Sequence, residues 1–113
     1  MRIKSSQTFS RIFRKGVVAA DGVLVMHAVN RLDAAVDGPE QTQLGLAVSK
    51  KVGNAPRRNR WKRLIREAFR QQRSSLPEGL QIVVRPKKGA KPDFHAIERS
   101  IVALSHRVQR KLS

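Results

Sequence analysis

The amino-acid sequence predicts a single α+β domain over residues 1–113, with its elements in the order α-β-β(-β)-α-β-α. Three observations indicate this fold class. Apolar residues recur at helical spacing in three separate segments. Between these segments lie short runs of aliphatic residues, bounded by Gly, Pro and Asp, that are typical of β-strands. The length of 113 residues, of which 40% are hydrophobic, suits one folded domain with one core.

The first helix is expected in the segment SSQTFSRIFRKG, near the start of the chain. Ser5 or Ser6 can cap its N-terminus, and Gly16 stands where a C-terminal cap is expected. Its apolar residues follow the i, i+3, i+4 pattern of one helix face: Phe9, Ile12 and Phe13. From Gly22 onward, the run GVLVMHAVNR predicts a strand that is buried on much of both faces.

The remaining strands and the last helix follow an acidic loop. This loop, LDAAVDGPEQTQ, holds three of the eight acidic residues: Asp33, Asp37 and Glu40. After it, LGLAVSKKVG predicts a second long strand, and LQIVVRP predicts a short strand closed by Pro86. Asp93 can then cap a last helix. The apolar face of that helix is marked at three- and four-residue steps by Phe94, Ile97, Ile101, Leu104 and Val108.

The middle helix is expected in RRNRWKRLIREAFR, residues 57–70, which holds seven cations and one carboxylate, Glu67. At about 100° per residue, one side forms an apolar stripe: Trp61, Leu64, Ile65, Ala68 and Phe69. The opposite side, with Arg60 on its flank, carries Asn59, Lys62, Arg63, Arg66, Arg70 and Arg73. We therefore expect one side to pack on the sheet and the other to form a cationic surface, where Glu67 can pair with Arg63 or Arg70.

The net charge of +16, from 24 Lys and Arg against 8 Asp and Glu, predicts a polyanionic partner. An anionic membrane surface is the competing partner, but no segment reaches the ~18–20 apolar residues of a membrane span. No apolar region follows the basic start MRIKSSQTF, as it would in a secretory signal. The absence of cysteine excludes disulfides and thiolate metal sites and fits a reducing compartment. We expect a cytoplasmic protein without a membrane partner.

The concentration of charge favours a nucleic-acid surface over a helix face that is merely solvated. Solvated helices usually mix both signs, because each i, i+4 ion pair contributes about 0.2–0.5 kcal/mol. Residues 50–73 instead hold ten of the 24 cations and a single acidic residue. The common DNA-docking modules are absent, and so is the aromatic sheet signature of an RNA-recognition motif. Because only 4% of residues are aromatic, phosphate and shape contacts are expected to dominate.

The segment GLAVSKKVGNAPRRNRWKRLIREAFR resembles the signature of the bacterial ribonuclease P protein subunit family. Three pieces match in order: V-S-K-K-x-G at residues 48–53, R-N-R at residues 58–60, and K-R-x-x-R-E-x-F-R at residues 62–70. The segment FSRIFRKG near the N-terminus resembles the F-x-x-V-F-x-x-G opening of the same family. The order of the expected elements also agrees with this family across nearly the whole chain.

The resemblance implies a small α+β sandwich in which the middle helix belongs to an unusual left-handed β-α-β crossover. It implies two partners, the catalytic ribonuclease P RNA and precursor tRNA, whose 5′ leader the protein would bind. The RNA and its Mg²⁺ ions would perform the hydrolysis that removes the leader. The RNA would hold most of this magnesium, and no protein ligand can be named. DNA is not expected as a partner.

Carried over residue by residue, the resemblance implies two contact regions. The region for the catalytic RNA comprises Lys50, Lys51, Arg57, Arg58, Asn59, Arg60, Lys62, Arg63, Arg66 and Arg70. The cleft for the leader comprises Phe9, Phe13 and His27. Core packing is the alternative for at least one of the two phenylalanines, and a surface position without function is the alternative for His27. Trp61 is interpreted as packing rather than RNA stacking, because its helical phase matches Leu64 and Phe69.

Nothing in the sequence predicts catalysis by the chain alone. The eight carboxylates are scattered, and the three histidines, His27, His95 and His106, lack the spacing of metal ligands. No phosphate-binding glycine-rich loop or nucleophile elbow is present. The first hypothesis is therefore a non-catalytic subunit of a ribonucleoprotein endoribonuclease that matures the 5′ end of tRNA. The alternative is a generic basic RNA-binding protein, such as a ribosomal component or an RNA chaperone.

Overall fold

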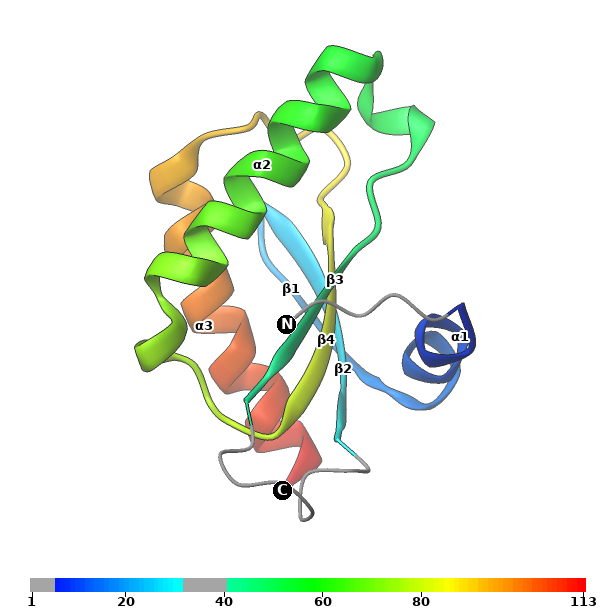
Figure 1. Cartoon of the computed structure of the whole chain (residues 1–113), viewed down its shortest axis with the longest axis vertical. Coiled ribbons are helices and arrows are strands. Elements are labelled where there is room, and N and C mark those ends of the chain that lie inside the picture. The colour runs from blue at the N-terminus through cyan, green and yellow to red at the C-terminus, as the bar shows by residue number, and fades with distance from the viewer. Residues whose placement is uncertain (1–5, 32–40) are drawn as a thin grey trace.

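The computed structural model of the chain describes residues 6–31 and 41–113. Figure 1 traces these residues from the N-terminal to the C-terminal helix. The helices are α1 (Ser6–Lys15), α2 (Ala55–Gln71) and α3 (Phe94–Leu112), and the short 3-10 helices η1 (Lys50–Val52) and η2 (Arg73–Ser75) flank α2. The strands are β1 (Val17–Ala20), β2 (Leu24–Asn30), β3 (Gln43–Leu46) and β4 (Leu80–Pro86). This order confirms the predicted α+β class.

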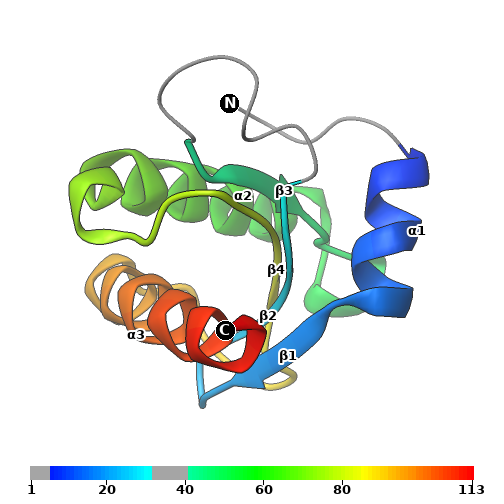
Figure 2. The same cartoon turned by 90° about the horizontal axis from the view of Figure 1, so that it is seen from below.

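The four strands form one sheet in the order β1-β2-β4-β3. Strand β2 pairs antiparallel with β1 and with β4, whereas β3 and β4 run parallel. Figure 2 shows the sheet end-on, with α2 and α3 against one face and α1 against the other. The sheet is therefore covered by helices on both of its faces.

The parallel strands β3 and β4 are joined through α2 by a left-handed crossover. In Figure 2 both strands run away from the viewer, and the chain passes from β3 at the top, through α2 on the left, to β4 below. About 98% of β-α-β connections have the opposite hand. The hand implied by the family resemblance is confirmed, and general topology rules would have predicted the wrong one.

The central strands carry apolar side chains on both faces because helices cover both faces. Toward α2 and α3, the two central strands contribute Leu24, Met26, Ala28, Leu80, Ile82 and Val84 to the main core. The helices contribute the apolar stripes that their sequences predict, including the fully buried Trp61, Ile65, Ile97, Ile101, Leu104 and Val108. Toward α1, a smaller cluster joins Ile12 to Val29 and Val83. The strand from GVLVMHAVNR is thus buried on both faces, as expected.

Strand β1 is an element that the sequence patterns did not single out. Its four residues, VVAA, are too few to show a period of their own. It lies at an edge of the sheet, and two of its carbonyls accept hydrogen bonds from α3. Arg107 Nη1 donates to the carbonyl of Ala20 over 2.9 Å, and Lys111 donates to the carbonyl of Val18. These two bonds hold the C-terminal half of α3 against the strand.

The second long strand expected from LGLAVSKKVG is shorter than predicted. Strand β3 ends at Leu46, and the ladder closes with a bond from Ala47 N to Val84 O over 3.0 Å. The next bond of a parallel ladder would need the N–H of residue 86, and Pro86 has none. The prediction was therefore wrong beyond this point, where the chain turns instead into η1.

The predicted cap of the last helix is confirmed, whereas that of the first helix is not settled. Helix α1 includes Ser6 as its first residue, and the other candidate cap, Ser5, lies outside the described residues. The Asp93 carboxylate caps α3 by accepting from Ala96 N–H over 3.0 Å. The acidic loop residues Asp33, Asp37 and Glu40 also lie outside the described residues.

Gly16, at the junction of α1 and β1, provides a test of this packing. A Cβ atom here would lie 2.7 Å from the Ala28 carbonyl oxygen and nearer still to that of Ile12. We expect Gly16→Ala to lower the free energy of unfolding by about 1–3 kcal/mol, as overpacking usually does. Urea unfolding measures this change. Gly22→Ala is the matched control, because a Cβ at Gly22 has no atom within 4 Å; equal losses in both variants would contradict the steric argument.

Candidate nucleic-acid interface

Helix α2 begins two residues before the basic segment, at Ala55. The side-chain oxygen of Asn54 accepts a hydrogen bond from Arg57 N–H over 3.1 Å and caps the helix. Pro56 lies in the first turn, where a missing N–H removes no helical bond. The helix therefore begins before the segment in which it was expected, and the whole basic segment lies on one continuous helix.

The apolar stripe of α2 faces the core, so its cationic side faces outward. Trp61, Ile65 and Ala68 have no exposed surface, and Leu64 packs half-buried against the same cluster. Truncating one such large core side chain typically costs about 3–5 kcal/mol, which makes a rotation of the helix unfavourable. Trp61 is a packing residue, as its helical phase predicted, and its ring is not available to an RNA base.

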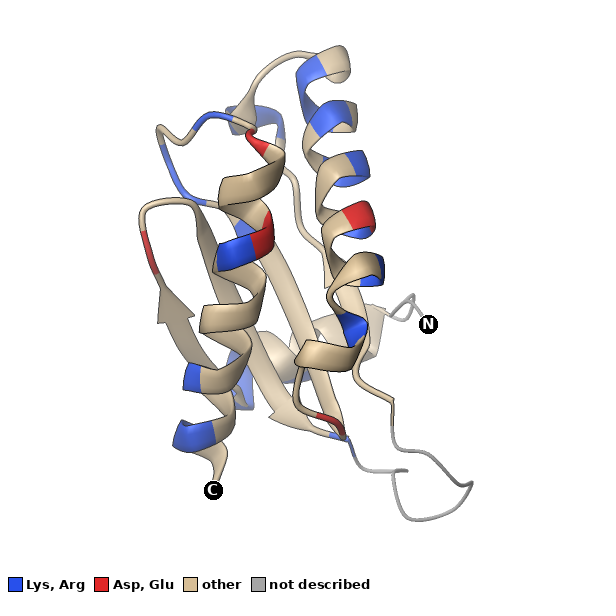
Figure 3. Ribbon diagram, turned by 90° about the vertical axis from the view of Figure 1, so that its left-hand side faces the viewer, with Lys and Arg blue, Asp and Glu red and all other residues tan. Residues whose placement is uncertain are grey.

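The outward side of α2 carries a cationic ridge, which we define as Arg57, Arg58, Arg60, Lys62, Arg63, Arg66 and Arg70. Figure 3 shows these cations at successive turns along the helix. Glu67 accepts from Arg70 Nε over 3.1 Å, and the bonds from Arg70, followed by one from Gln71, lower the pKa of this carboxyl. Within residues 6–31 and 41–113, no carboxylate pairs with the other six cations. The ridge therefore keeps most of its charge uncompensated.

A basic hollow of about 440 Å³ lies beside the N-terminus of α2. Five cations line it: Lys51, Arg57, Arg85, Lys87 and Lys88. A second hollow, of about 450 Å³, adjoins it where the chain leaves β3 and is lined mainly by apolar residues. The two hollows share Ser49, Val52, Arg85 and Pro86 as lining residues. Arg85 thus borders both spaces.

An aromatic cluster occupies the opposite face of the sheet, beside α1. The Phe13 side chain is 43% exposed, and its ring meets that of His27 edge-on at 4.8 Å between centroids. The Phe9 ring lies 6.4 Å from that of Phe13 and packs half-buried against the cluster of Ile12. Of the two phenylalanines, Phe9 therefore contributes to packing, which was the alternative expected for one of them, and Phe13 offers an accessible ring.

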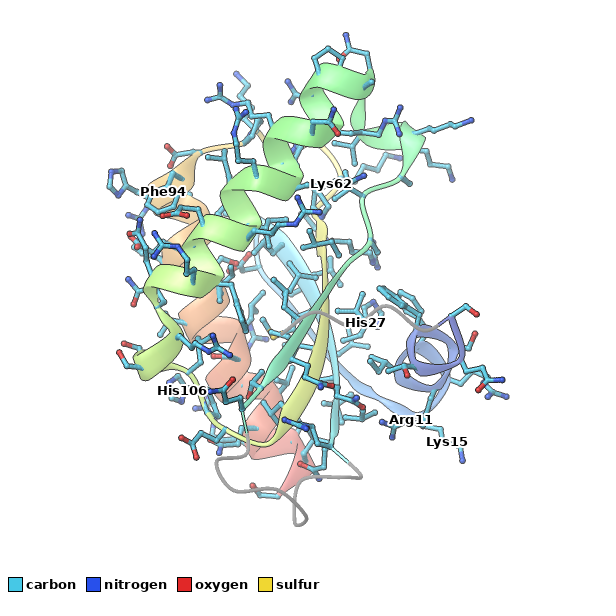
Figure 4. All side chains as sticks on the ribbon, viewed as in Figure 1. Arg11, Lys15, His27, Lys62, Phe94 and His106 are labelled. Atoms are coloured by element: carbon cyan, nitrogen blue, oxygen red, sulfur yellow. The ribbon has the colours of Figure 1, made fainter. Side chains whose placement is uncertain are left out.

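His27 connects this aromatic cluster to the basic residues. Figure 4 shows His27 on the side of the sheet that faces α1. Arg85 Nε donates to His27 Nε2 over 3.4 Å, which requires an unprotonated Nε2 and leaves the proton on Nδ1. Burial, with the Arg85 charge as a second cause, lowers the pKa of His27 below its ordinary value of 6.5. Most copies of the His27 imidazole are therefore unprotonated at pH 7.

The residues selected from the sequence fall into two groups in the structure. Lys50 and Lys51 lie exposed in η1, and Lys51 meets Arg57 in the basic hollow at the start of the ridge. The aromatic cluster brings together Phe9, Phe13 and His27. The sequence patterns missed Arg85, Lys87 and Lys88, three cations that surround Pro86. Their proximity in the sequence was visible, but only the fold brings them to the start of α2.

The described residues hold no group of three or more His, Cys, Asp or Glu side chains that could bind a metal ion. Among the helices of residues 6–31 and 41–113, none is long and apolar enough to span a membrane. The arrangement offers positive charge, an accessible aromatic ring and two hollows, which are the means by which proteins bind RNA strands.

Comparisons with known proteins agree with this arrangement. The sequence matches the Ribonuclease P family over residues 1–109. It is 36% identical over 102 residues to the ribonuclease P protein component of Listeria monocytogenes, spanning 89% of this chain and 82% of that protein. The corresponding protein of Brevibacillus brevis is 35% identical over 109 residues, spanning 96% and 82% of the two chains.

Solved structures of such proteins share the fold. The RNase P protein of Staphylococcus aureus superposes with a TM-score of 0.78 at 31% identity, covering 99% of this chain and 97% of the other. That of Thermotoga maritima gives a TM-score of 0.81 at 29% identity, with 96% and 97% coverage. The chain therefore belongs to the ribonuclease P protein family, whose members are the non-catalytic protein subunits of a ribonucleoprotein endoribonuclease of tRNA processing.

Proposed function

We propose that the cationic ridge binds the catalytic ribonuclease P RNA and that the aromatic cluster binds the 5′ leader of precursor tRNA. The observation that carries this proposal is the set of six ridge cations without a carboxylate partner among the described residues. Like charges at successive turns of one helix repel each other. RNA phosphates relieve this repulsion and release counterions as they bind. Asn59, exposed among these cations, adds a side-chain amide for phosphate or base contacts.

The aromatic cluster suits a single-stranded leader better than a duplex. Phe13 and Val18 are the large apolar side chains that the described residues leave most exposed, at 43% and 42%. Val18 is the cross-strand neighbour of His27, so both side chains and the Phe13 ring border one surface. Unpaired bases can stack on such rings, whereas bases inside a duplex cannot reach them.

Magnesium is assigned to the RNA partner in this proposal. The described residues offer no ligand set for a metal ion, so we name no protein ligand and no protein-bound step of the hydrolysis. The chain supplies positive charge and holds the two RNA molecules in place. Their negative backbones can then approach each other. A cytoplasmic location is part of the same proposal and fits the absence of cysteine.

Reconstitution tests the proposed role directly. Added to a bacterial ribonuclease P RNA at low magnesium concentration, the protein should raise the rate of precursor-tRNA cleavage, because its cations replace part of the screening by Mg²⁺. Gel analysis of the released leader measures this rate. A generic basic RNA-binding protein with a similar net charge is the control. If the protein gives no more stimulation than this control at any ratio, the proposal fails.

The ridge is tested by removing two exposed charges from it. We expect Arg60→Gln with Arg66→Gln to weaken binding to the catalytic RNA and to reduce the log–log salt slope by roughly 1 for each phosphate that is no longer neutralised. Affinity measured across a salt series gives both values. Arg99→Gln with Arg110→Gln, two exposed positions of α3, removes the same charge elsewhere. Equal effects of the two pairs would show that net charge, not the ridge, determines binding.

Phe13 gives a separate test of leader binding. Phe13→Ala should weaken binding of leader-bearing precursor tRNA to the holoenzyme by about 1–3 kcal/mol, the contribution of one base–aromatic stack. The dissociation constant of leaderless tRNA should not change, and it serves as the internal control. The exposed ring makes little core contact, so thermal stability is expected to stay near that of the wild type. A loss that is equal with and without the leader would contradict the assignment.

A further inference from the structure

We infer that the β1 edge of the sheet carries a second contact surface for the catalytic RNA. We call this surface the edge patch and define it as Arg14 and Lys15 of α1 with Arg107 and Lys111 of α3. The inference rests on the proposed binding of that RNA, and it adds a contact at positions that the ridge does not include. The chain would then lie between two parts of one folded RNA.

Two cations of the edge patch are held in place by backbone carbonyls. Arg107 Nη1 donates to the Ala20 carbonyl over 2.9 Å, and Lys111 donates to the Val18 carbonyl. Each bond uses one N–H of a group that has several, so further donors stay available for a ligand. Both side chains remain exposed. Because they are already ordered, binding a ligand costs them less conformational entropy than it costs a mobile surface cation.

Strand β1 sets the spacing of these two cations. Val18 and Ala20 are two residues apart in an extended strand, so their carbonyls lie roughly 6–7 Å apart. Both carbonyls point to the outer edge of the sheet, since they accept from α3. Neighbouring phosphates along one RNA strand have a similar spacing. Arg107 and Lys111 can therefore contact consecutive phosphates of one backbone.

The edge patch keeps a surplus of positive charge. Within residues 6–31 and 41–113, none of its four cations forms an ion pair. Asp21, directly after β1, attracts Arg107, but its carboxylate is occupied by other donors. These donors are Val23 N–H at 2.8 Å, Leu24 N–H at 3.0 Å and the Ser100 hydroxyl at 2.7 Å. A polyanion that binds here is attracted by the remaining charge and releases counterions.

The positive surface continues from β1 onto α1. Lys15 ends this helix, and only Gly16 separates it from β1. Figure 4 shows Lys15 beside Arg11 at this end of α1. A hollow of about 460 Å³ lies on the side of α1 opposite its apolar face and is lined, without any carboxylate, by Ser6, Gln7, Ser10, Arg11, Arg14 and Lys15. An RNA backbone held by Arg107 and Lys111 can therefore extend along α1.

The lack of aromatic side chains in the edge patch favours a helical part of the catalytic RNA over an unpaired leader. Trp61, Phe69 and Phe94 belong to the main core. Phe9 and Phe13 lie on the side of α1 that faces the sheet. Unpaired strands gain much of their affinity by stacking bases on rings. RNA helices are instead contacted through their phosphates and 2′-hydroxyls, which match fixed cations.

The edge patch and the ridge require different segments of the RNA. Strands β1 and β3 form the two opposite edges of the sheet. Figure 2 shows α2 beside β3, whereas β1 lies at the other end of the sheet, between α3 and the end of α1. An RNA helix bound along the ridge leaves the edge patch uncovered. A second segment of the same folded RNA is the partner that this surface fits.

The experiment measures binding of the catalytic RNA by two variants of the edge patch. Arg107→Gln with Lys111→Gln removes two charges, while each glutamine amide still has a donor for the β1 carbonyl. Arg14→Gln with Lys15→Gln removes two charges from α1, away from these carbonyls. Each pair should lower the affinity roughly tenfold or more and reduce the log–log salt slope by roughly 2, one for each phosphate no longer neutralised. Arg99→Gln with Arg110→Gln on α3 is the charge-matched control.

Hydroxyl-radical footprinting of the same complexes locates the lost contacts. The edge-patch pairs should expose a segment of the catalytic RNA that Arg60→Gln with Arg66→Gln in the ridge leaves protected. Precursor tRNA is labelled in parallel, so that a contact with this RNA is detected separately. Circular dichroism verifies the fold of each variant. If the pair on α3 unfolds, the pair on α1, which leaves the bonds to β1 intact, decides alone.

Two results would overturn the inference. One is an affinity and salt slope equal to those of the control in either folded edge-patch pair. The other is a loss of protection confined to the ridge segment or to precursor tRNA. If the ridge pair weakens binding while the edge-patch pairs match the control, only the second contact fails. If the wild type binds the catalytic RNA no better than an unrelated RNA of equal length, the proposed function fails as well.

Discussion

The burial of one apolar stripe on α2 is the constraint on which the rest of the molecule depends. Trp61, Ile65 and Ala68 lie fully inside the core formed with the sheet and α3, so the rotation of the helix about its axis is fixed. The basic positions of α2 then fall on the side away from this core, where Arg57, Arg60, Arg63 and Arg66 are exposed. The hydrophobic core thus offsets the repulsion that so many like charges create on a single helix.

The two faces of the sheet carry two different apolar clusters. One face carries the main core and, beyond it, the ridge; the other carries the small cluster of Ile12, Val29 and Val83 beneath α1. Arg11 also donates a hydrogen bond from α1 to Gln81 of β4, and Phe13 of the same helix remains exposed beside His27. Arg85 lies where the two regions approach each other, at the end of β4.

Much of this arrangement could be predicted from local patterns, and the exceptions have physical causes. Helical periodicity identified the buried face of α2, and the cap of α3 could be predicted because it needs only one hydrogen bond to a nearby residue, from Ala96 N–H to the Asp93 carboxylate. The end of β3 depends on Pro86, which is distant in the sequence and adjacent only through the sheet. The hollow depends on the same long-range pairing, since Arg85 and Lys51 meet only once β4 lies beside β3. No local sequence pattern predicts the hand of the crossover. It was expected only from the family resemblance.

The contacts of Arg107 and Lys111 with the β1 carbonyls have a consequence for the chain before it meets RNA. An edge strand with open carbonyls is a template on which another polypeptide can add a strand. Here two long cationic side chains occupy those acceptors, and an incoming strand would have to displace both of them. A copy of the chain that has not yet bound RNA is therefore protected on this side against the addition of a foreign strand.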